Sequence, residues 1–277
     1  GSVAGGIPLI QSLDNGLAAA RIEQVYGILN GTTNYILSRA EAGLNMEEAL
    51  LEAQEKGFAE KDPAMDLSGR DTAQKISVLA SLITGAWVKP KDIVREGIGR
   101  IEKQDIDFAR DTLGCAVRLL GSLKLAGSDP VRVESSVFPT LVPLDHPLAA
   151  VRREYNAVLV KTSQAGDIML YGKGAGPGPT ASAVVGDIFM LARDILGGLP
   201  AGRQPGSRAT ILPDNRSVSS FYLRLLARDR PGVLARITLA LGRRGVSIST
   251  IHQSGRPAAA GLPLVLTPHP TRHGRFA

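Results

Sequence analysis

The chain has 277 residues, of which 44% are hydrophobic and 21% charged, proportions usual for a globular protein. This length allows one large domain or two unequal ones. No run of eighteen apolar residues occurs and no secretion signal opens the chain, so we expect no membrane partner. A single cysteine, Cys115, cannot form an internal disulfide, and this favours a cytoplasmic location.

The net charge of +6 is unevenly distributed. Residues 1–200 carry 20 basic and 24 acidic side chains, whereas residues 201–277 carry 12 arginines and only two acidic residues. An arginine-rich tail is one way to bind nucleic acid. These arginines are scattered and do not alternate with aromatic residues, so we expect no nucleic-acid partner. The imbalance instead indicates two regions of different character.

The first hundred residues predict one strand and several helices. Residues 21–29 alternate as a strand does and end at a turn-forming Asn-Gly pair. Thr32 and Thr33 can cap a helix that runs to residue 42, and Asn45 can cap a second from 46 to 57. A loop then leads to a helix that starts at residue 66 or 68, with a capping box at Ser68 and Asp71, and ends at 82.

The middle of the chain is mostly strand. After a short helix and turn at 92–101 and a helix at 105–113, four strands are predicted, at 116–127, 131–143, 155–164 and 166–174. An apolar helix at 180–196 follows and ends at two glycines. Strands surrounded by helices predict an α/β (α+β) fold, a mixed sheet covered by helices, over residues 1–198.

Residues 199–215 are rich in Gly, Pro and polar side chains, a composition typical of a linker. Beyond this linker, residues 216–277 form a second predicted domain. It contains a strand at 221–226, an amphipathic helix at 232–243 and two further strands at 246–251 and 263–267.

Four ionisable residues in the segment 53–75 attract attention: Glu60, Asp66, Asp71 and Lys75. An Asp and a Lys four residues apart are most often a surface ion pair. On a helical projection, however, Asp71 and Lys75 share an arc of about 100° with Val78, Leu79 and Leu82. Gln74, Ser77 and Ser81 gather elsewhere. The projection therefore predicts that the pair points inward with the apolar face, where charges must be paired or used.

The same segment resembles the signature of the homoserine dehydrogenase family. The matching residues are Ala53, Gly57, Asp62, Pro63, Asp66, Gly69, Asp71 and Lys75. Three other stretches are similar to that family: VAGGIPLI at 3–10, GILNGTTNYIL at 27–37 and YGKGAGPGPTASAVVGDI at 171–188. The resemblance covers residues 1–198 almost continuously.

This resemblance implies an oxidoreductase that interconverts L-aspartate 4-semialdehyde and L-homoserine with NAD(P), in threonine and methionine biosynthesis. Lys75 would be the catalytic acid/base, and Asp71 would orient it. Glu60 and Asp66 would hold the amino and hydroxyl groups of the amino-acid substrate. Asn30 and Thr32, at a predicted helix N-terminus, are further candidates for substrate binding.

The resemblance also implies a cofactor site and a cation site. Gly174 and Gly176 would lie near the nicotinamide, and the backbone carbonyls of Val3, Gly5 and Ile7 would bind a monovalent cation. Members of the family begin with a Rossmann domain carrying GxGxxG, and no such pattern occurs here. We therefore expect a carboxyl-terminal portion that turns over poorly alone and forms a homodimer or homotetramer.

Residues 216–277 resemble an ACT domain, a small ferredoxin-like βαββαβ sensor of amino acids. The match lies in ARDRPGVLARI, where Asp229 and Gly232 would contact an amino-acid effector. No second helix or last strand is evident in the final residues, so we expect an incomplete module. An alternative to the enzyme is a non-catalytic amino-acid-binding regulatory protein that uses both regions.

Overall fold

The computed structural model describes residues 2–126, 132–198, 206, 209–212, 218–253 and 261–272. The chain divides into two compact units, Gly1–Ile211 and Leu212–Ala277, and each is described by itself. Strand β7 (Thr210–Ile211) belongs to the sheet of the first unit, although both residues fall in the predicted linker. Most other residues of that linker lie outside the described part.

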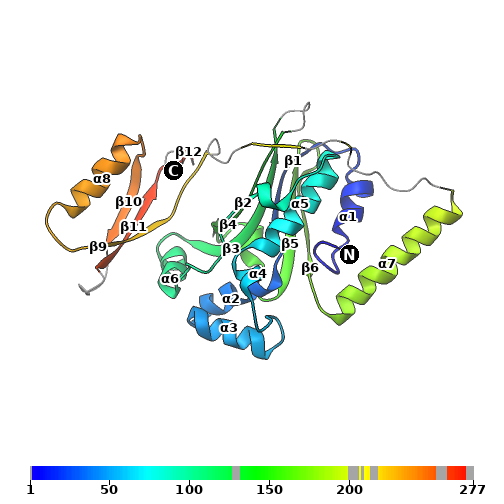
Figure 1. The fold of residues 1–277 in the computed structure, drawn as a ribbon, viewed down its shortest axis with the longest axis horizontal. Helices are drawn as coiled ribbons and strands as arrows, with labels where there is room; N and C mark the ends of the chain where they lie inside the picture. Colours follow the sequence, from blue (N-terminus) through cyan, green and yellow to red (C-terminus); the bar gives the residue numbers. More distant parts are fainter. Residues whose placement is uncertain are drawn as a thin grey trace. The chain divides into compact units, whose positions relative to one another are not determined.

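The first unit is built on a seven-stranded mixed sheet (Figure 1), which confirms the predicted fold class. Its order is β2-β4-β3-β1-β5-β6, and β7 also pairs with β4. Neighbours are antiparallel except that β2 and β7 run parallel to β4. The longer strands are β1 (Ile22–Ile28), β3 (Cys115–Leu125), β4 (Arg132–Pro143), β5 (Tyr155–Thr162) and β6 (Gly166–Lys173), and the short one is β2 (Val94–Arg95).

The predicted helices are present with two corrections. The helices are α1 (Leu9–Gln11), α2 (Gly31–Glu41), α3 (Met46–Glu55), α4 (Ala64–Leu67), α5 (Arg70–Thr84), α6 (Lys103–Asp111) and α7 (Pro177–Leu196), with short turns η1 (Ser12–Gly16), η2 (Pro90–Asp92) and η3 (Pro147–Ala150). The helix predicted within 92–101 is wrong, because strand β2 lies at Val94–Arg95, whereas the predicted turn is present at residues 99–100. Helix α7 begins three residues early, since proline is well suited to a first helical turn.

Three caps were predicted and one is confirmed. Asn45 caps α3 in a reciprocal box: its Oδ1 accepts from Glu48 N at 2.8 Å, and its own N–H donates to Glu48 Oε2 at 2.9 Å. Helix α2 is capped by Asn30, whose Oδ1 accepts from Thr33 N, and not by the two threonines. Ser68 caps nothing, because the residue before α5 is Gly69 in a left-handed conformation.

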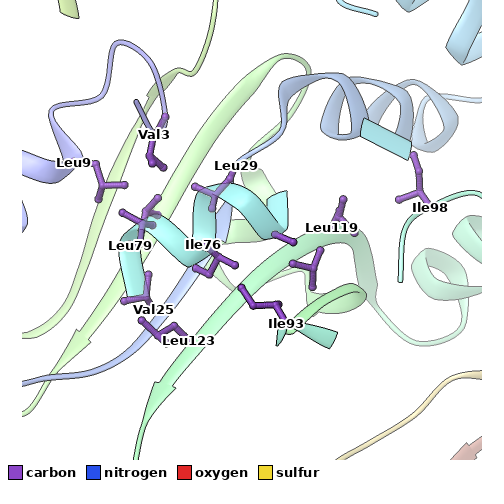
Figure 2. Packing of buried hydrophobic residues seen from close by; sticks show 14 of the residues in the cluster. Val3, Leu9, Val25, Leu29, Ile76, Leu79, Ile93, Ile98, Leu119 and Leu123 are labelled. Carbon is purple, nitrogen blue, oxygen red and sulfur yellow. The ribbon is translucent and has the colours of Figure 1, made fainter. Parts of the chain in front are cut away.

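The helix-covered face of the sheet carries the larger core. Ile76 and Leu79 of α5 point to Val25, Leu29 and Leu123 of the sheet region (Figure 2), and all are almost fully buried. A second cluster lies on the opposite face and includes Leu148 of η3, which is 1% exposed.

The buried face of α5 differs from the predicted one. Val78 and Leu82 are 38% and 37% exposed, whereas Ser77 and Ser81 are buried. The serine hydroxyls donate to backbone carbonyls of the preceding turn, so their burial leaves no unpaired oxygen. Asp71 and Lys75 therefore lie along the half-exposed edge of α5 and not in its apolar face.

Helix α7 extends from the end of β6 (Figure 1) and has no buried residue, although its sequence is apolar. Seven of its large apolar side chains are about half exposed or more: Val184, Val185, Ile188, Phe189, Leu191, Ile195 and Leu196. Within the described residues, no helix is both long enough and apolar enough to cross a lipid bilayer.

The second unit contains a three-stranded antiparallel sheet of order β10-β11-β9 and one helix. Its elements are β8 (Val218–Ser219), β9 (Leu223–Ala227), α8 (Val233–Arg243), β10 (Ile248–Gln253), β11 (Leu262–Pro268) and β12 (Thr271–Arg272). Ala227, Leu264 and Leu266 form its core. The short strand β12 pairs with β8, so the tail contributes a strand that the sequence did not predict.

Candidate active site at the end of strand β1

Four polar side chains meet where β1 ends and α2 begins. Asn30 donates through Nδ2 to Asp66 Oδ1 at 2.7 Å and to Asp71 Oδ2 at 2.8 Å. Lys75 Nζ donates to the same Asp71 oxygen at 2.7 Å and to the carbonyl of Leu29 at 2.9 Å. We call Asn30, Asp66, Asp71 and Lys75 the polar cluster. All four were predicted as site residues, and the structure brings them together.

A break between α4 and α5 places the two aspartates on one side. Gly69 adopts φ 74°, a left-handed conformation that side chains disfavour, so the chain turns between Asp66 and Asp71. The neighbouring loop holds this turn, because Ile98 N donates to Leu67 O at 2.9 Å. A side chain at Gly97 would overlap Leu67 O, so glycine is required at that approach.

The lysine is accessible as well as fixed. The side chains of Lys75 and Asp71 are 26% and 22% exposed, so both border the open edge of α5. An ammonium has three N–H donors. Two of them are used by Asp71 and by the Leu29 carbonyl in the described structure, and the third can donate to a ligand.

Thr32 and Glu60 lie differently from the polar cluster. Thr32 is buried, and its hydroxyl donates to the Phe58 carbonyl at 2.6 Å, so it anchors the loop that carries Glu60. The Glu60 carbonyl accepts from Gln54 Nε2 at 3.1 Å. The Glu60 side chain is exposed, and among the described residues no hydrogen bond joins its carboxylate to the polar cluster.

An ion-pair network centred on Glu52 supports the loop that carries Glu60. Glu52 accepts from Arg39 at 2.6 Å, from Tyr35 Oη at 3.1 Å and from Lys56. The hydrogen bond from Lys56, followed by that from Arg39, lowers the pKa of Glu52 to about 2. The Tyr35 ring packs on Phe58 with centroids 4.8 Å apart. The network therefore ties α2 and α3 to the loop.

The glycine loop after β6 lies against the N-terminal loop. A side chain at Gly174 would overlap the amide of Asn156, and one at Gly5 would overlap the carbonyl of Gly174. The N–H of Gly6 donates to the Lys173 carbonyl at 3.2 Å. These contacts require glycine at positions 5 and 174 and join two segments far apart in the chain.

The start of α7 is not suited to a phosphate. Helix N-termini bind anions through free N–H groups in the first turn. Here Gly176 precedes the helix, and Pro177 and Pro179 occupy two of its first three positions, so those two positions have no N–H to offer. The loop of Gly174 and Gly176 is therefore better suited to a neutral polar group.

The predicted cation-binding loop turns through two consecutive left-handed residues, Ala4 (φ 61°) and Gly5 (φ 48°). Val3 and Ile7 on either side are buried. The Ile7 carbonyl already accepts from Leu9 N at 2.7 Å. In the described residues, no group of three or more His, Cys, Asp or Glu side chains is arranged to hold a metal ion.

Sequence reasoning missed one residue of this region, Asn156. It is 1% exposed and its Oδ1 has no hydrogen-bond partner in the described structure. Ala157 pairs with Ile28 of β1, and Asn156 pairs with Gly172 of β6, so it lies between the polar cluster and the glycine loop. The sequence does contain a signal for Asn156: a polar residue directly precedes the apolar run AVLV, within a strand whose other residues are mostly buried.

In the second unit, the predicted effector residues lie on the loop between β9 and α8. Gly232 has φ 84° and precedes the first residue of α8. Asp229 is exposed on the same loop. This loop leaves the sheet and enters the helix through a conformation that glycine favours.

Comparisons with known proteins agree with these features. Residues 8–189 match the family model described as homoserine dehydrogenase, and residues 221–269 match the ACT domain. The homoserine dehydrogenase of Synechocystis sp. is 40% identical over a match of 288 positions, gaps included. The match covers 99% of this chain and 65% of that protein. That of Neisseria gonorrhoeae is also 40% identical, with 98% of this chain and 63% of the relative covered.

Solved structures are similar as well. A homoserine dehydrogenase from Thiobacillus denitrificans has a TM-score of 0.89 at 38% identity, covering 99% of this chain and 63% of that one. One from S. aureus has a TM-score of 0.68 at 32% identity, covering 89% and 59%. The chain thus spans less than two thirds of the length of these relatives. The family match extends over most of the first unit, and the chain belongs to the homoserine dehydrogenase family.

Proposed function

We propose that the chain forms the substrate-binding part of an NAD(P)-dependent oxidoreductase that interconverts L-aspartate 4-semialdehyde and L-homoserine. The observation that carries the proposal is the geometry of Lys75. Its ammonium is held by Asp71 and by the Leu29 carbonyl at a half-exposed edge, and one donor is left for a ligand. When an aldehyde is reduced, negative charge develops on its oxygen, and a fixed N–H donor of this kind can protonate that oxygen to give the hydroxyl.

The carboxylates of the polar cluster suit an amino-acid substrate. Asp66 uses Oδ1 and Asp71 uses Oδ2 for the hydrogen bonds within the cluster. The second oxygen of each can accept from a substrate ammonium or hydroxyl, and Glu60 on its exposed loop adds a third carboxylate. Asn30 and Thr32 contribute by holding the aspartates and the loop of Glu60, respectively.

In the direction of reduction, Lys75 donates a proton to the carbonyl oxygen of the substrate, and in the reverse direction it accepts that proton from the hydroxyl. Asp71 keeps the ammonium directed to one place. The nicotinamide cofactor supplies or takes up the hydride when bound. Gly174 and Gly176 would lie against its nicotinamide, because Gly174 lets the loop approach Asn156 closely and Pro177 and Pro179 leave the start of α7 with few N–H donors for an anion.

Other parts of the proposal concern ions, regulation and assembly. The Val3, Gly5 and Ile7 carbonyls would bind a monovalent cation in the loop of left-handed residues. An amino-acid effector would bind at Asp229 and Gly232, where the exposed loop enters α8. We further propose a cytoplasmic protein that works as a homodimer or homotetramer.

The test measures reduction of aspartate semialdehyde by the chain together with a separately supplied nucleotide-binding segment of a relative. Lys75→Ala should abolish most of the rate. Lys103→Ala is the matched control, since Lys103 also forms an i,i+4 ion pair, with Asp107 on α6, but outside the polar cluster and the network that supports the Glu60 loop. Equal rates for wild type and Lys75→Ala would refute the role of Lys75.

Calorimetry separates this proposal from the alternative of an amino-acid sensor without catalysis. The enzyme predicts homoserine binding that Asp71→Ala weakens. A sensor predicts binding of an effector such as threonine alone, lost on substitution of Gly232 and unchanged in Asp71→Ala.

A further inference from the structure

The side chain of Asn156 lies on the same side of the sheet as the polar cluster. Alternate residues of β5 point to opposite faces of the sheet. Val158 and Val160 belong to the core under the helices, whereas Ala157 and Leu159 belong to the core on the other face. By this alternation Asn156 lies on the helix side, the side on which Lys75 contacts the Leu29 carbonyl.

Strand pairing gives its position along the sheet edge. Because Ile28 of β1 pairs with Ala157, Leu29 lies beside Asn156 on one side. Gly172 of β6 pairs with Asn156 on the other side. Adjacent strands are about 4.8 Å apart, so Asn156 is roughly one strand from the Leu29–Asn30 end and one strand from the glycine loop. Asn156 therefore lies between the polar cluster and the glycine loop along the sheet.

The amide of Asn156 is buried without a partner for its oxygen. Buried side-chain amides are almost always hydrogen-bonded, and an exception calls for an explanation. Gly174, which has no side chain, lies directly over this amide. A ligand would reach this amide by displacing the glycine loop.

We propose that Asn156 is a ligand-binding residue whose side-chain amide pairs with a primary carboxamide on the ligand bound beside the glycine loop. The inference rests on the proposed function, in which a nicotinamide ring lies at that loop. An amide both donates and accepts, so a carboxamide N–H satisfies Asn156 Oδ1 while the carboxamide oxygen accepts from Nδ2.

The surroundings favour a carboxamide over a charged group. An anion would find few donors at the start of α7, where Pro177 and Pro179 lack N–H groups. A substrate ammonium is better served by the carboxylates of Asp66 and Asp71. A neutral planar group with both a donor and an acceptor fits the remaining position.

The first test needs no cofactor and uses the melting temperature of the chain. Asn156→Leu keeps the branching at Cγ and removes an oxygen that lacks a partner, so the melting temperature should fall less than in a variant of an asparagine whose amide is fully engaged. The matched control is Asn34→Leu. Asn34 is equally buried and its Oδ1 likewise lacks a partner, but its Nδ2 donates to the carbonyls of Val151, Arg153 and Tyr155, so its loss should lower the melting temperature.

The second test compares NAD with its 3-acetylpyridine analogue, in which a methyl group replaces the carboxamide NH2. With the nucleotide-binding segment supplied as above, wild type should oxidise homoserine with a KM for NAD roughly 5- to 10-fold lower than for the analogue, as expected for one hydrogen bond. Asn156→Leu should reduce that ratio to about 1. In a side-chain amide NMR spectrum of the chain, nicotinamide mononucleotide should shift the Asn156 signals.

Two results would overturn the inference. One is a melting temperature that falls as far in Asn156→Leu as in Asn34→Leu, which would make Asn156 a structural residue. The other is an Asn156→Leu variant that oxidises homoserine and still discriminates between the two cofactors. Failure of the proposed function is distinct, since wild type would then oxidise homoserine with neither cofactor.

Discussion

Helices α5 and α7 have opposite relations to the rest of the molecule, although α7 is the more apolar of the two. Helix α5 buries Ile76 and Leu79 completely against the sheet and carries Asp71 and Lys75 along its edge. Helix α7 buries no residue in the described structure, and its Ile188 is 60% exposed. Apolar sequence alone thus does not decide burial; a facing surface does.

The difference also shows where function can be placed on a helix. The edge of α5 is rigid because its neighbouring face is packed, and this holds Lys75 while leaving it accessible. An unpacked helix offers accessibility without that rigidity. Substitutions on the two helices should therefore have unequal effects on activity and stability.

Lys75→Ala should lower homoserine oxidation roughly 10²- to 10⁴-fold, the range for loss of a positioned acid/base. The melting temperature should change little, because the side chain lies on the half-exposed edge of α5. Steady-state kinetics and thermal unfolding on the same sample check both parts. A variant that is inactive only because it unfolds would contradict the placement of Lys75 on that edge.

Ile76→Ala should lower the free energy of unfolding by about 2–5 kcal/mol, since it removes a fully buried side chain and leaves a cavity. Urea denaturation followed by circular dichroism measures the change. A loss below about 1 kcal/mol would show that α5 is not packed as described.

Glu52 of α3 provides a pH test of an ion pair outside the polar cluster. Its pKa is lowered from 4.5 to about 2 in the folded chain, chiefly by Lys56. A lowered carboxyl pKa stabilises the fold above the unfolded value and loses that contribution as pH falls toward about 2. Glu52→Gln should therefore show a weaker loss of stability between these pH values. An unchanged acid profile would mean that other carboxyls dominate.

Ile188→Ala, the same substitution on α7, should change the free energy of unfolding by no more than about 0.5 kcal/mol. Its side chain is already mostly exposed, so little apolar contact is lost. Denaturation of the chain by itself makes the comparison with Ile76→Ala direct. A loss comparable to that of Ile76→Ala would show that this face of α7 is covered in solution.

Much of this fold could be predicted because local signals were strong. The strands of the mixed sheet and the cap at Asn45 follow from alternation and from the reciprocal box with Glu48. The candidate site could be predicted because the segment 53–75 matches the spacing of the homoserine dehydrogenase signature. The two carboxylates of Asp66 and Asp71 meet only because Gly69 breaks the helix between them.

Other features depend on tertiary contacts that a helical projection does not include. The projection placed Asp71 and Lys75 in the buried face of α5, but Ser77 and Ser81 bury there because their hydroxyls bond to the helix backbone. Strand β2 forms because β4 offers an edge, although its own residues look like a turn. Asn156 escaped notice because its neighbours become clear only from strand pairing.

The pairing of β1 with β5 has a consequence for protein synthesis. Ile28 pairs with Ala157, so the strand that positions Leu29 and Asn30 waits for a partner made more than a hundred residues later. At ribosomal rates of about 5–20 residues per second, that interval is on the order of 10 s. Such long-range pairing slows folding. Until then the edge of β1 that faces β5 has no partner, so the site cannot be completed before residue 157 has been synthesised.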